Sequence, residues 1–296
     1  MQIVPVTFTY STGGRETGGG TGPQGLVNRG LLERLREQGH QVLAPVDVRL
    51  TDEEASQYGG WNLATTAGGR LAETVADVRR RWPDAFILGL LADCNAVVGV
   101  LGGMQAPVDS NWPQRVGLVF VDAHGDYNTP DTSPSGMLGG MPVAVAAGKA
   151  LEGHRRRHGL RYPLQPPDIV MAGLRDLDAT EARAIREDGI TRVSENEMLD
   201  PDKAARHIMP QLVARQDAVY VHVDLDILDP DLAPAAGLPA PGGLSGAQLG
   251  RFLRSVVAYP KVRALAVVSY RAHDDRDGLT GEEVETAILT ALQDAP

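Results

Sequence analysis

The feature that most constrains the fold of this chain is the alternation of short apolar runs with amphipathic stretches. The apolar runs are nearly continuous and rich in β-branched residues. They lie at residues 2–8, 85–91, 116–122, 168–174, 218–226 and 263–270. Such runs are typical of parallel strands covered on both faces, and the amphipathic stretches predict the helices that connect them. The sequence therefore predicts an α/β fold in which a mostly parallel sheet lies between two layers of helices.

One of these connections is expected within residues 25–42. Four leucines recur there at helical spacing, and Gly39 follows them as a terminator. The leucines are Leu26, Leu31, Leu32 and Leu35. No Ser/Gly-rich linker or change of composition divides the chain, so we predict a single domain over residues 1–296. We interpret residues 232–245 as a functional loop that follows a strand.

The composition excludes several classes of protein. A formal net charge of −10 would repel a polyanion such as nucleic acid from most of the surface. One cysteine in 296 residues excludes an internal disulfide framework. Residues 1–14 lack the pattern of a signal peptide, and no apolar run reaches the roughly 18 residues of a membrane span. We therefore expect a soluble, cytoplasmic protein that binds neither nucleic acid nor membrane.

Polar side chains gather where two predicted strands end, which is where open parallel sheets bind their ligands. Asp122, His124 and Asp126 follow one strand at alternate positions, and Asp224 and Asp226 end another. Successive side chains of an extended strand point to opposite faces, so alternate residues converge on one side. We therefore predict that these five side chains form one site, on strands that remain extended.

This set of side chains suits a metal ion. Four carboxylates that meet without a positive charge repel one another strongly, and neither motif contains a lysine or an arginine. One Asp-x-Asp at a strand end is usually part of a turn or cap, but two such motifs, one with a histidine, favour a metal site. Carboxylates with one or two nitrogen ligands suit Mn²⁺ or a related ion better than a closed structural zinc site.

Residues 122–128 and 224–230 resemble the two metal-binding signatures of the arginase/agmatinase (ureohydrolase) family, and the resemblance extends over nearly the whole chain. It implies a binuclear manganese centre, with two Mn²⁺ per chain. It also implies a three-layer α/β/α arginase-like fold whose mostly parallel sheet has about eight strands. Members of the family are often trimers or hexamers, so a homo-trimer or hexamer is one expectation for this chain.

The resemblance also implies the role of each metal ligand. Asp122 and Asp224 would bridge the two ions, Asp126 would bind one ion, and His124 and Asp226 would bind the other. The remaining ligand of the family is a histidine, and Cys94 stands at its position.

Cys94 has two interpretations. A free cysteine is often buried and inert, but its register with a ligand histidine favours a metal ligand. A thiolate is softer than imidazole, so weak retention of Mn²⁺ is expected. In having a cysteine in place of this histidine, the chain resembles the Nω-hydroxy-L-arginine hydrolase of D-cycloserine biosynthesis. The predicted substrate is therefore not limited to that of an ordinary arginase.

Four further residues match the family positions that recognise an amino-acid substrate. Asn128 and Ser135 match the residues of the α-carboxylate loop, and Asp178 and Glu181 match the acidic pair that receives the α-amino group. The alternative is that Asp178 and Glu181 only open a helix, where acidic residues are favourable. Their combination with Asn128 favours a small-molecule amino-acid substrate over an agmatine-like ligand.

Two positions depart from the family pattern. Gly139 replaces the histidine used for proton transfer, and Ala272 lies near the position of the guanidinium-binding glutamate. A hydroxyguanidine is less basic than a guanidine, so it could depend less on both groups. His273, Asp274 or Asp275 could also fill the missing role, although ordinary solvent exposure is equally compatible with each.

The expected reaction is metal-assisted hydrolysis of a C–N bond, in which two cations activate a water molecule that Asp126 orients. The products would be ornithine and hydroxyurea from Nω-hydroxy-L-arginine, or ornithine and urea from arginine. Two alternatives remain open. One is a non-catalytic or weakly metal-binding module, and the other is a hydrolase of another amidine or amide.

Overall fold

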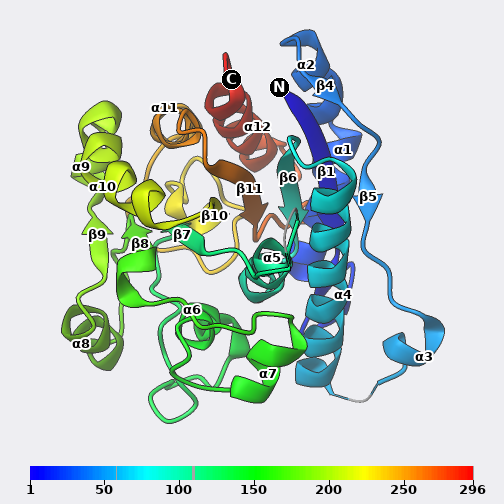
Figure 1. The fold of residues 1–296 in the computed structure, drawn as a ribbon. Coiled ribbons are helices and arrows are strands. Elements are labelled where there is room, and N and C mark those ends of the chain that lie inside the picture. The colour runs from blue at the N-terminus through cyan, green and yellow to red at the C-terminus, as the bar shows by residue number, and fades with distance from the viewer. Residues whose placement is uncertain (58, 109–110, 296) are drawn as a thin grey trace.

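A central parallel sheet dominates the computed structural model, which describes residues 1–57, 59–108 and 111–295 (Figure 1). Within these residues the sheet has nine strands, and every strand pair in it is parallel. The order is β4-β1-β6-β11-β10-β7-β8-β9, and β5 also pairs with β1. The predicted fold class is confirmed. The strands are β1 (Gln2–Phe8), β4 (Gln41–Val42), β5 (Val46–Asp47), β6 (Phe86–Leu91), β7 (Val116–Val121), β8 (Ile169–Ala172), β9 (Thr191–Val193), β10 (Ala218–Asp224) and β11 (Val262–Val268).

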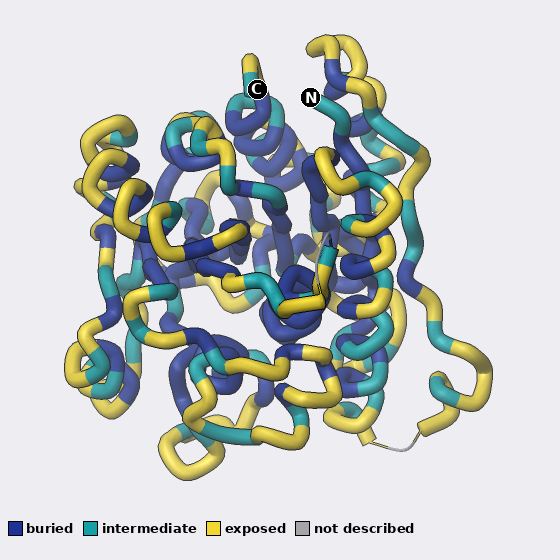
Figure 2. The backbone as a smooth tube through the Cα atoms, viewed as in Figure 1, coloured by how far each residue is buried: buried dark blue, intermediate teal, exposed yellow. Residues whose placement is uncertain are grey.

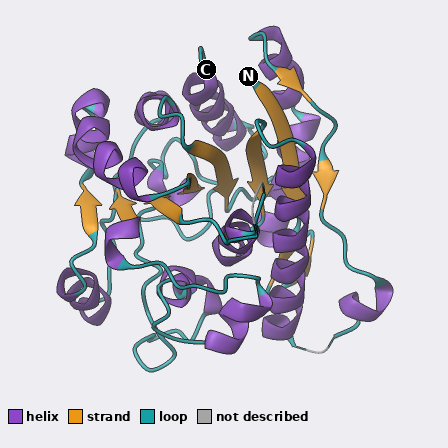
Figure 3. Cartoon of the chain, viewed as in Figure 1, coloured by secondary structure: helices purple, strands orange, loops and turns teal. Residues whose placement is uncertain are grey.

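Helices cover both faces of this sheet, so the strands lie in the middle layer (Figure 3). One layer contains α1 (Gly22–Asn28), α2 (Leu31–Glu37), α9 (Glu195–Met198), α10 (Pro201–Arg215), α11 (Gly246–Val257) and α12 (Leu279–Leu292). The other contains α4 (Gly60–Arg81), α5 (Ala96–Gln105), α6 (Pro142–Ala146), α7 (Glu152–Arg157) and α8 (Ala179–Glu187).

The smaller elements connect these layers. They are α3 (Asp52–Ala55), the hairpin of β2 (Tyr10–Ser11) and β3 (Gly14–Arg15), and four 3₁₀ turns, η1 (Gly18–Thr21), η2 (Leu138–Gly140), η3 (Pro166–Asp168) and η4 (Leu225–Ile227). Within the described residues, no helix combines the length and apolar character needed to cross a membrane.

The apolar character of the strands follows from this layering. All seven residues of β10 are buried, with Val221 packed in the core on one face of the sheet and Tyr220 in the core on the other. Burial of a large aliphatic side chain contributes about 1.5–3 kcal/mol. The buried interior therefore follows the sheet through the centre of the molecule, and the exposed residues lie mostly on the outer helices and loops (Figure 2).

The helix expected from the leucine spacing in residues 25–42 is divided into two. Gly30 adopts a left-handed conformation, with φ of 84°, between α1 and α2. A residue with positive φ cannot continue a right-handed helix, and glycine accepts this conformation without a steric penalty. The four leucines still pack in one core, and Gly39, with φ of 90°, terminates α2 as predicted.

Candidate metal centre and substrate cavity

A cavity of about 580 Å³ lies at the carboxyl ends of neighbouring strands of the sheet. It receives residues that follow β6, β11, β10, β7 and β8, which are five consecutive positions in the strand order. Eight acidic side chains and one histidine line it, with no lysine or arginine among the described lining residues. The cavity therefore favours cations and ligands that carry a positive group.

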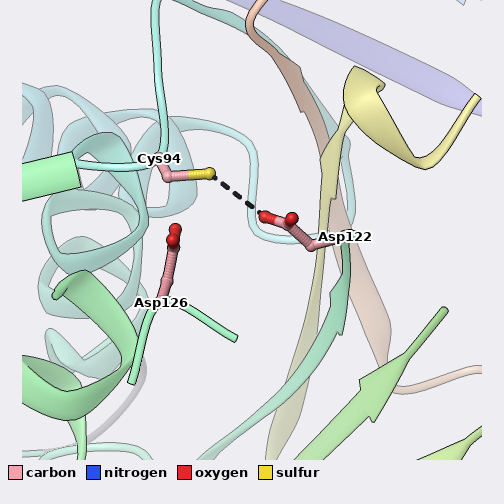
Figure 4. Close-up of side chains that lie close together, drawn as sticks. All are labelled: Cys94, Asp122 and Asp126. Atoms are coloured by element: carbon pink, nitrogen blue, oxygen red, sulfur yellow. Dashed lines mark hydrogen bonds between the residues drawn. The ribbon is translucent and has the colours of Figure 1, made fainter. Parts of the chain in front are cut away.

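The first cluster at the base of the cavity consists of Cys94, Asp122 and Asp126 (Figure 4). These three side chains are buried and point toward one another, with candidate ligand atoms within 4.8 Å. Cys94 Sγ lies 3.6 Å from Asp122 Oδ2. Oδ2 of Asp126 is buried and has no hydrogen-bond partner in the described part of the chain. An unpaired buried carboxylate oxygen is costly, so this atom is suited to a cation or a water molecule.

The second cluster consists of Asp122, His124 and Asp226, so Asp122 belongs to both clusters. Nδ1 of His124 lies 2.8 Å from Asp226 Oδ2 and 3.5 Å from Asp122 Oδ1. Asp224 lies beside both clusters. The Cys94 thiol donates to Asp224 Oδ2 at 3.0 Å, and the Asp226 N–H donates to Asp224 Oδ1 at 3.0 Å.

The prediction that these residues lie on extended strands is confirmed for Asp224, the last residue of β10, and wrong for the other four, although all the side chains converge. β7 ends at Val121, and Asp226 lies in the 3₁₀ turn η4. Asp126 has a φ of 47°, a conformation that non-glycine residues rarely adopt. A hydrogen bond from the backbone stabilises the turn after β7, because the His124 N–H donates to Asp122 Oδ1 at 2.6 Å. The carboxylates of Asp122 and Asp224 therefore also fix the backbone of the turns that carry the neighbouring ligands.

Burial and, after it, repulsion between neighbouring charges raise the pKa values of the buried carboxyl groups. Burial, followed by the charges of nearby aspartates, raises the pKa of Asp122 and of Asp126, and it raises the pKa of Asp224 to about 7. Hydrogen bonds to Asp122 and Asp226 raise the pKa of His124 to about 11. Without a cation, the cluster is therefore expected to retain protons.

The donor set fits divalent ions. It combines carboxylate oxygens, an imidazole nitrogen and a sulfur atom in two groups that share one aspartate. Divalent ions would replace the retained protons and neutralise the repulsion between carboxylates.

The predicted substrate-recognition residues also reach the cavity. Nδ2 of Asn128 donates to Asp178 Oδ2 at 3.0 Å. Asp178 is the N-cap residue of α8, but its side chain makes no capping hydrogen bond, so opening the helix does not account for its orientation. Glu181 is buried and accepts the Tyr127 N–H at 2.8 Å. Ser135 lies further along the loop that carries Asn128 and accepts the Met137 N–H at 3.2 Å.

The comparison with known proteins identifies the family. The sequence model of the arginase family matches residues 1–292. The chain belongs to the arginase family. It is 32% identical to the arginase of Bacillus caldovelox over 232 residues, which cover 76% of this chain and 75% of that protein. It is 31% identical to arginase-1 of Xenopus laevis over 293 residues, which cover 96% and 90% of the two chains.

The fold is shared with solved arginases. The crystal structure of arginase from Bacillus subtilis matches this chain with a TM-score of 0.83 and 27% identity, covering 99% of this chain and 98% of the other. The protein is therefore an arginase-family hydrolase with the three-layer fold of that family.

Of the two positions that depart from the arginase-family pattern, Gly139 lines the cavity and Ala272 does not. Gly139 lines the cavity, and a Cβ atom built there would meet nothing within 4 Å. Ala272, expected near the anchoring position, does not line the cavity, and the residue that follows β11 into the cavity is Ser269. Ser269 has a φ of 70° and donates its hydroxyl to Asp224 Oδ2 at 2.5 Å. Ala272 instead faces Gly25 of α1, outside the cavity.

The three residues considered as replacements do not line the cavity in the described structure. Asp275 accepts the Tyr270 hydroxyl at 2.7 Å, and Asp274 pairs with Arg271 at 2.8 Å. His273 is exposed. The two aspartates therefore hold the loop after β11.

Several residues that line the cavity belong to none of the sequence motifs and were not predicted. Thr12 and Trp61 reach the rim from N-terminal segments, and Leu238 comes from the loop predicted at residues 232–245. Asp93 also lines the cavity and accepts the Asn95 N–H at 3.0 Å, and burial raises its pKa to about 6. Only Asp93 could have been suspected, because it precedes Cys94.

Proposed function

We propose that this chain is a binuclear, manganese-dependent ureohydrolase that cleaves the guanidino C–N bond of an arginine-like amino acid. Nω-Hydroxy-L-arginine is the preferred substrate, with ornithine and hydroxyurea as products, and arginine is the slower alternative. The observation that carries the proposal is one cavity with two metal-ligand clusters at its base and an Asn128–Asp178 contact at its side.

The clusters define which residues would hold the ions. Cys94 and Asp126 would hold one, His124 and Asp226 the other, and Asp122 and Asp224 would lie between them. Two bound Mn²⁺ ions would supply Lewis acidity for activating water and for stabilising negative charge as the C–N bond is attacked.

We assign to Asp126 the transfer of a proton from the attacking water to the leaving nitrogen. Its Oδ2 atom is buried and unpaired among the described residues, so it can accept a hydrogen bond from the attacking water. The same carboxyl group can then return the proton to the leaving nitrogen of the ornithine product. For the hydroxylated substrate this carboxyl group can supply the proton alone, which accommodates glycine at position 139.

A neutral residue at the end of β11, Ser269, favours a hydroxyguanidine. Ser269 presents a hydroxyl group at the end of β11, and that hydroxyl is bonded to Asp224. A guanidinium group needs a compensating charge when it leaves water, whereas the less basic hydroxyguanidine can bind neutral. A hydroxyl group at position 269, without a negative charge, therefore costs the hydroxylated substrate less binding energy than it costs arginine.

The amino-acid head group would bind between the loop after β7 and the start of α8. Asn128 and Ser135 would contact the α-carboxylate, and Asp178 and Glu181 would receive the α-amino group. Gly125 permits this arrangement, because a Cβ at that position would lie 2.9 Å from the Glu181 carboxyl group.

The proposal is tested by supplying the Mn²⁺-loaded protein with arginine, Nω-hydroxy-L-arginine, agmatine and formimidoylglutamate in separate reactions. Ornithine, urea and hydroxyurea are then quantified. We expect kcat/KM for Nω-hydroxy-L-arginine to exceed that for arginine by about tenfold or more, and agmatine to be the poorest guanidine. Preference for agmatine or formimidoylglutamate would reject the substrate assignment, and no turnover of any compound by metal-replete protein would favour a non-catalytic module.

A further inference from the structure

A buried histidine lies directly behind Cys94 and has no role in the chemistry described above. His222 belongs to β10, two residues before Asp224, and is fully buried. Its ring stacks on Phe120 of β7, with the ring centroids 5.3 Å apart and the planes inclined by 5°. Phe120 is also its register partner in the sheet. The imidazole is therefore held in one orientation by the packing of two adjacent strands.

Both ring nitrogens of His222 have partners. Nδ1 lies 2.6 Å from the hydroxyl oxygen of Tyr220, and Nε2 lies 3.4 Å from Cys94 Sγ. The sulfur atom in turn lies 3.0 Å from Asp224 Oδ2. A continuous line of contacts thus runs from Tyr220 through His222 and Cys94 to the carboxylates.

The direction of these hydrogen bonds follows from the Tyr220 hydroxyl. Tyr220 is fully buried, and its hydroxyl has no other acceptor in the part of the chain that the structure describes. The hydroxyl must therefore donate to Nδ1, because a buried donor without a partner is costly. A neutral imidazole carries one ring proton, so that proton lies on Nε2 and faces the sulfur of Cys94.

The reverse arrangement is less favourable. If the Cys94 thiol donated to Nε2, the ring proton would lie on Nδ1 and the Tyr220 hydroxyl hydrogen would lose its acceptor. In the favoured arrangement, Cys94 accepts from His222 and its own S–H is free to donate to Asp224. Every polar hydrogen in the line then has a partner.

We propose that His222 is a positioning residue for Cys94, whose Nε2–H donates to the sulfur and so holds Cys94 as a metal ligand. The inference rests on the proposed metal-dependent function. When a metal ion displaces the thiol proton, the sulfur becomes an anion that can no longer donate to Asp224. The N–H of His222 then supplies a hydrogen bond to that anion from the side away from the cluster. The imidazole expected at position 94 is thus replaced by a pair, a sulfur ligand and the histidine that orients it.

The test measures metal binding rather than turnover. Metal-free wild type, His222→Leu, His222→Gln and Tyr220→Phe are titrated with Co²⁺, whose bond to sulfur gives a charge-transfer band in the near ultraviolet. The glutamine amide can restore a donor toward Cys94, whereas leucine cannot. Tyr10→Phe is the matched control. Tyr10, on β2, is another buried tyrosine; its hydroxyl accepts from the Leu50 N–H, and it does not line the cavity.

We expect His222→Leu to weaken Co²⁺ binding by about tenfold or more and to shift the sulfur-to-cobalt band. His222→Gln should recover most of the affinity, Tyr220→Phe should have a smaller effect of the same sign, and Tyr10→Phe should match wild type. Far-ultraviolet circular dichroism checks that each variant is folded. If His222→Leu does not fold, the comparison of Tyr220→Phe with Tyr10→Phe decides the outcome.

A double-mutant cycle separates positioning from a general structural effect. Because His222 is proposed to act through the sulfur, His222→Leu should change Co²⁺ affinity little in a Cys94→Ala background. Equal losses with and without Cys94, or identical affinity and spectra for wild type and His222→Leu, would overturn the inference and leave the proposed function intact. Absence of any Co²⁺ or Mn²⁺ binding by wild type would instead overturn the proposed function as well.

Discussion

Asp224 connects three neighbours at the base of the cavity. Its Oδ2 atom accepts from Cys94 and Ser269, and its Oδ1 atom accepts from the Asp226 N–H. Burial, with the charge of Asp226, nevertheless raises its pKa from 3.8 to about 7. Hydrogen bonds alone therefore do not compensate for placing this carboxylate among others, and metal ions have a clear electrostatic role.

This pKa predicts how pH changes the stability of the metal-free protein. A carboxyl group whose pKa is higher in the folded state stabilises the fold below its unfolded pKa, and that contribution is lost as the pH rises through the folded pKa. Through Asp224, metal-free wild type should lose free energy of unfolding between about pH 4 and pH 7. Asp224→Asn should therefore become more stable relative to wild type, by on the order of 2 kcal/mol, between pH 5 and pH 8.

Chemical denaturation of both metal-free proteins at the two pH values measures this difference. Asp131→Asn, at an exposed position, should leave the wild-type pH dependence unchanged. A constant stability difference between Asp224→Asn and wild type at both pH values would show that Asp224 does not carry the expected charge repulsion.

Single residues differ in how well the sequence predicts them. Asp122, Asp126 and Asp224 could be grouped because carboxyl ends of parallel strands meet at one edge of a sheet. Ser269 could not be identified, because its left-handed backbone turns a hydroxyl into the cavity and no sequence pattern encodes that turn. His222 was hidden within an apolar strand, where a histidine is usually only a packed core residue.

At the scale of elements, two short segments shape the cavity. The N-terminal end of α8 presents Asp178 and Glu181, and the turn η2 presents Gly139. Periodicity predicts strands and long helices because each has one buried face, but it does not fix where they end. The division at Gly30 and the turn η4 at Asp226 are set by local backbone conformation, so both were missed.

The start of α8 can be tested as an α-amino site. Asp178→Ala should lower kcat/KM for arginine and Nω-hydroxy-L-arginine by a factor that corresponds to about 2 kcal/mol, because a charged hydrogen bond is lost. 5-Guanidinopentanoate, which keeps the carboxylate but lacks the α-amino group, should be affected less. Thr180→Ala, an exposed change on the same helix, serves as the control. Equal losses for 5-guanidinopentanoate and the amino acids would remove the α-amino assignment.

The turn η2 can be tested by restoring an imidazole. The open space around Gly139 should admit histidine without displacing the backbone. Gly139→His is expected to raise kcat for arginine by about tenfold or more through proton transfer, while turnover of Nω-hydroxy-L-arginine changes less. Gly139→Ala controls for the added Cβ atom. If histidine and alanine give the same kinetics with both substrates, proton supply at this turn is not limiting.

At the scale of the whole molecule, helices α2 and α12 of one layer are joined by ion pairs to one buried carboxylate. Glu285 of α12 is buried and contacts Arg34 of α2, and its Oε2 lies 3.2 Å from Arg29 Nε. The layered topology itself was predictable from alternating apolar runs, but such a contact between distant segments was not. The predictions of one domain over residues 1–296 and of a trimer or hexamer stay predictions.

Removing Glu285 should destabilise the molecule without changing its chemistry. Glu285→Ala leaves two partly exposed arginines without their carboxylate partner and should lower the free energy of unfolding by about 1.5 kcal/mol. Glu282→Ala, on the same helix and exposed, should have a small effect. Denaturant titration compares the variants, and kcat of the folded fraction should match wild type. An unchanged unfolding midpoint for Glu285→Ala would contradict a stabilising role for the ion pair.

Two clusters that have Asp122 in common are proposed to bind the ions on which hydrolysis depends. Metal content measured together with activity tests this directly. Wild type and Asp122→Asn are loaded with Mn²⁺, freed of unbound metal, and analysed for manganese and for hydrolysis of Nω-hydroxy-L-arginine in the same samples. We expect about two ions per chain in active wild type. Because Asp122 belongs to both clusters, we expect far less metal and far less activity in the variant. Equal manganese in both proteins, or full hydrolysis by metal-free wild type, would contradict it.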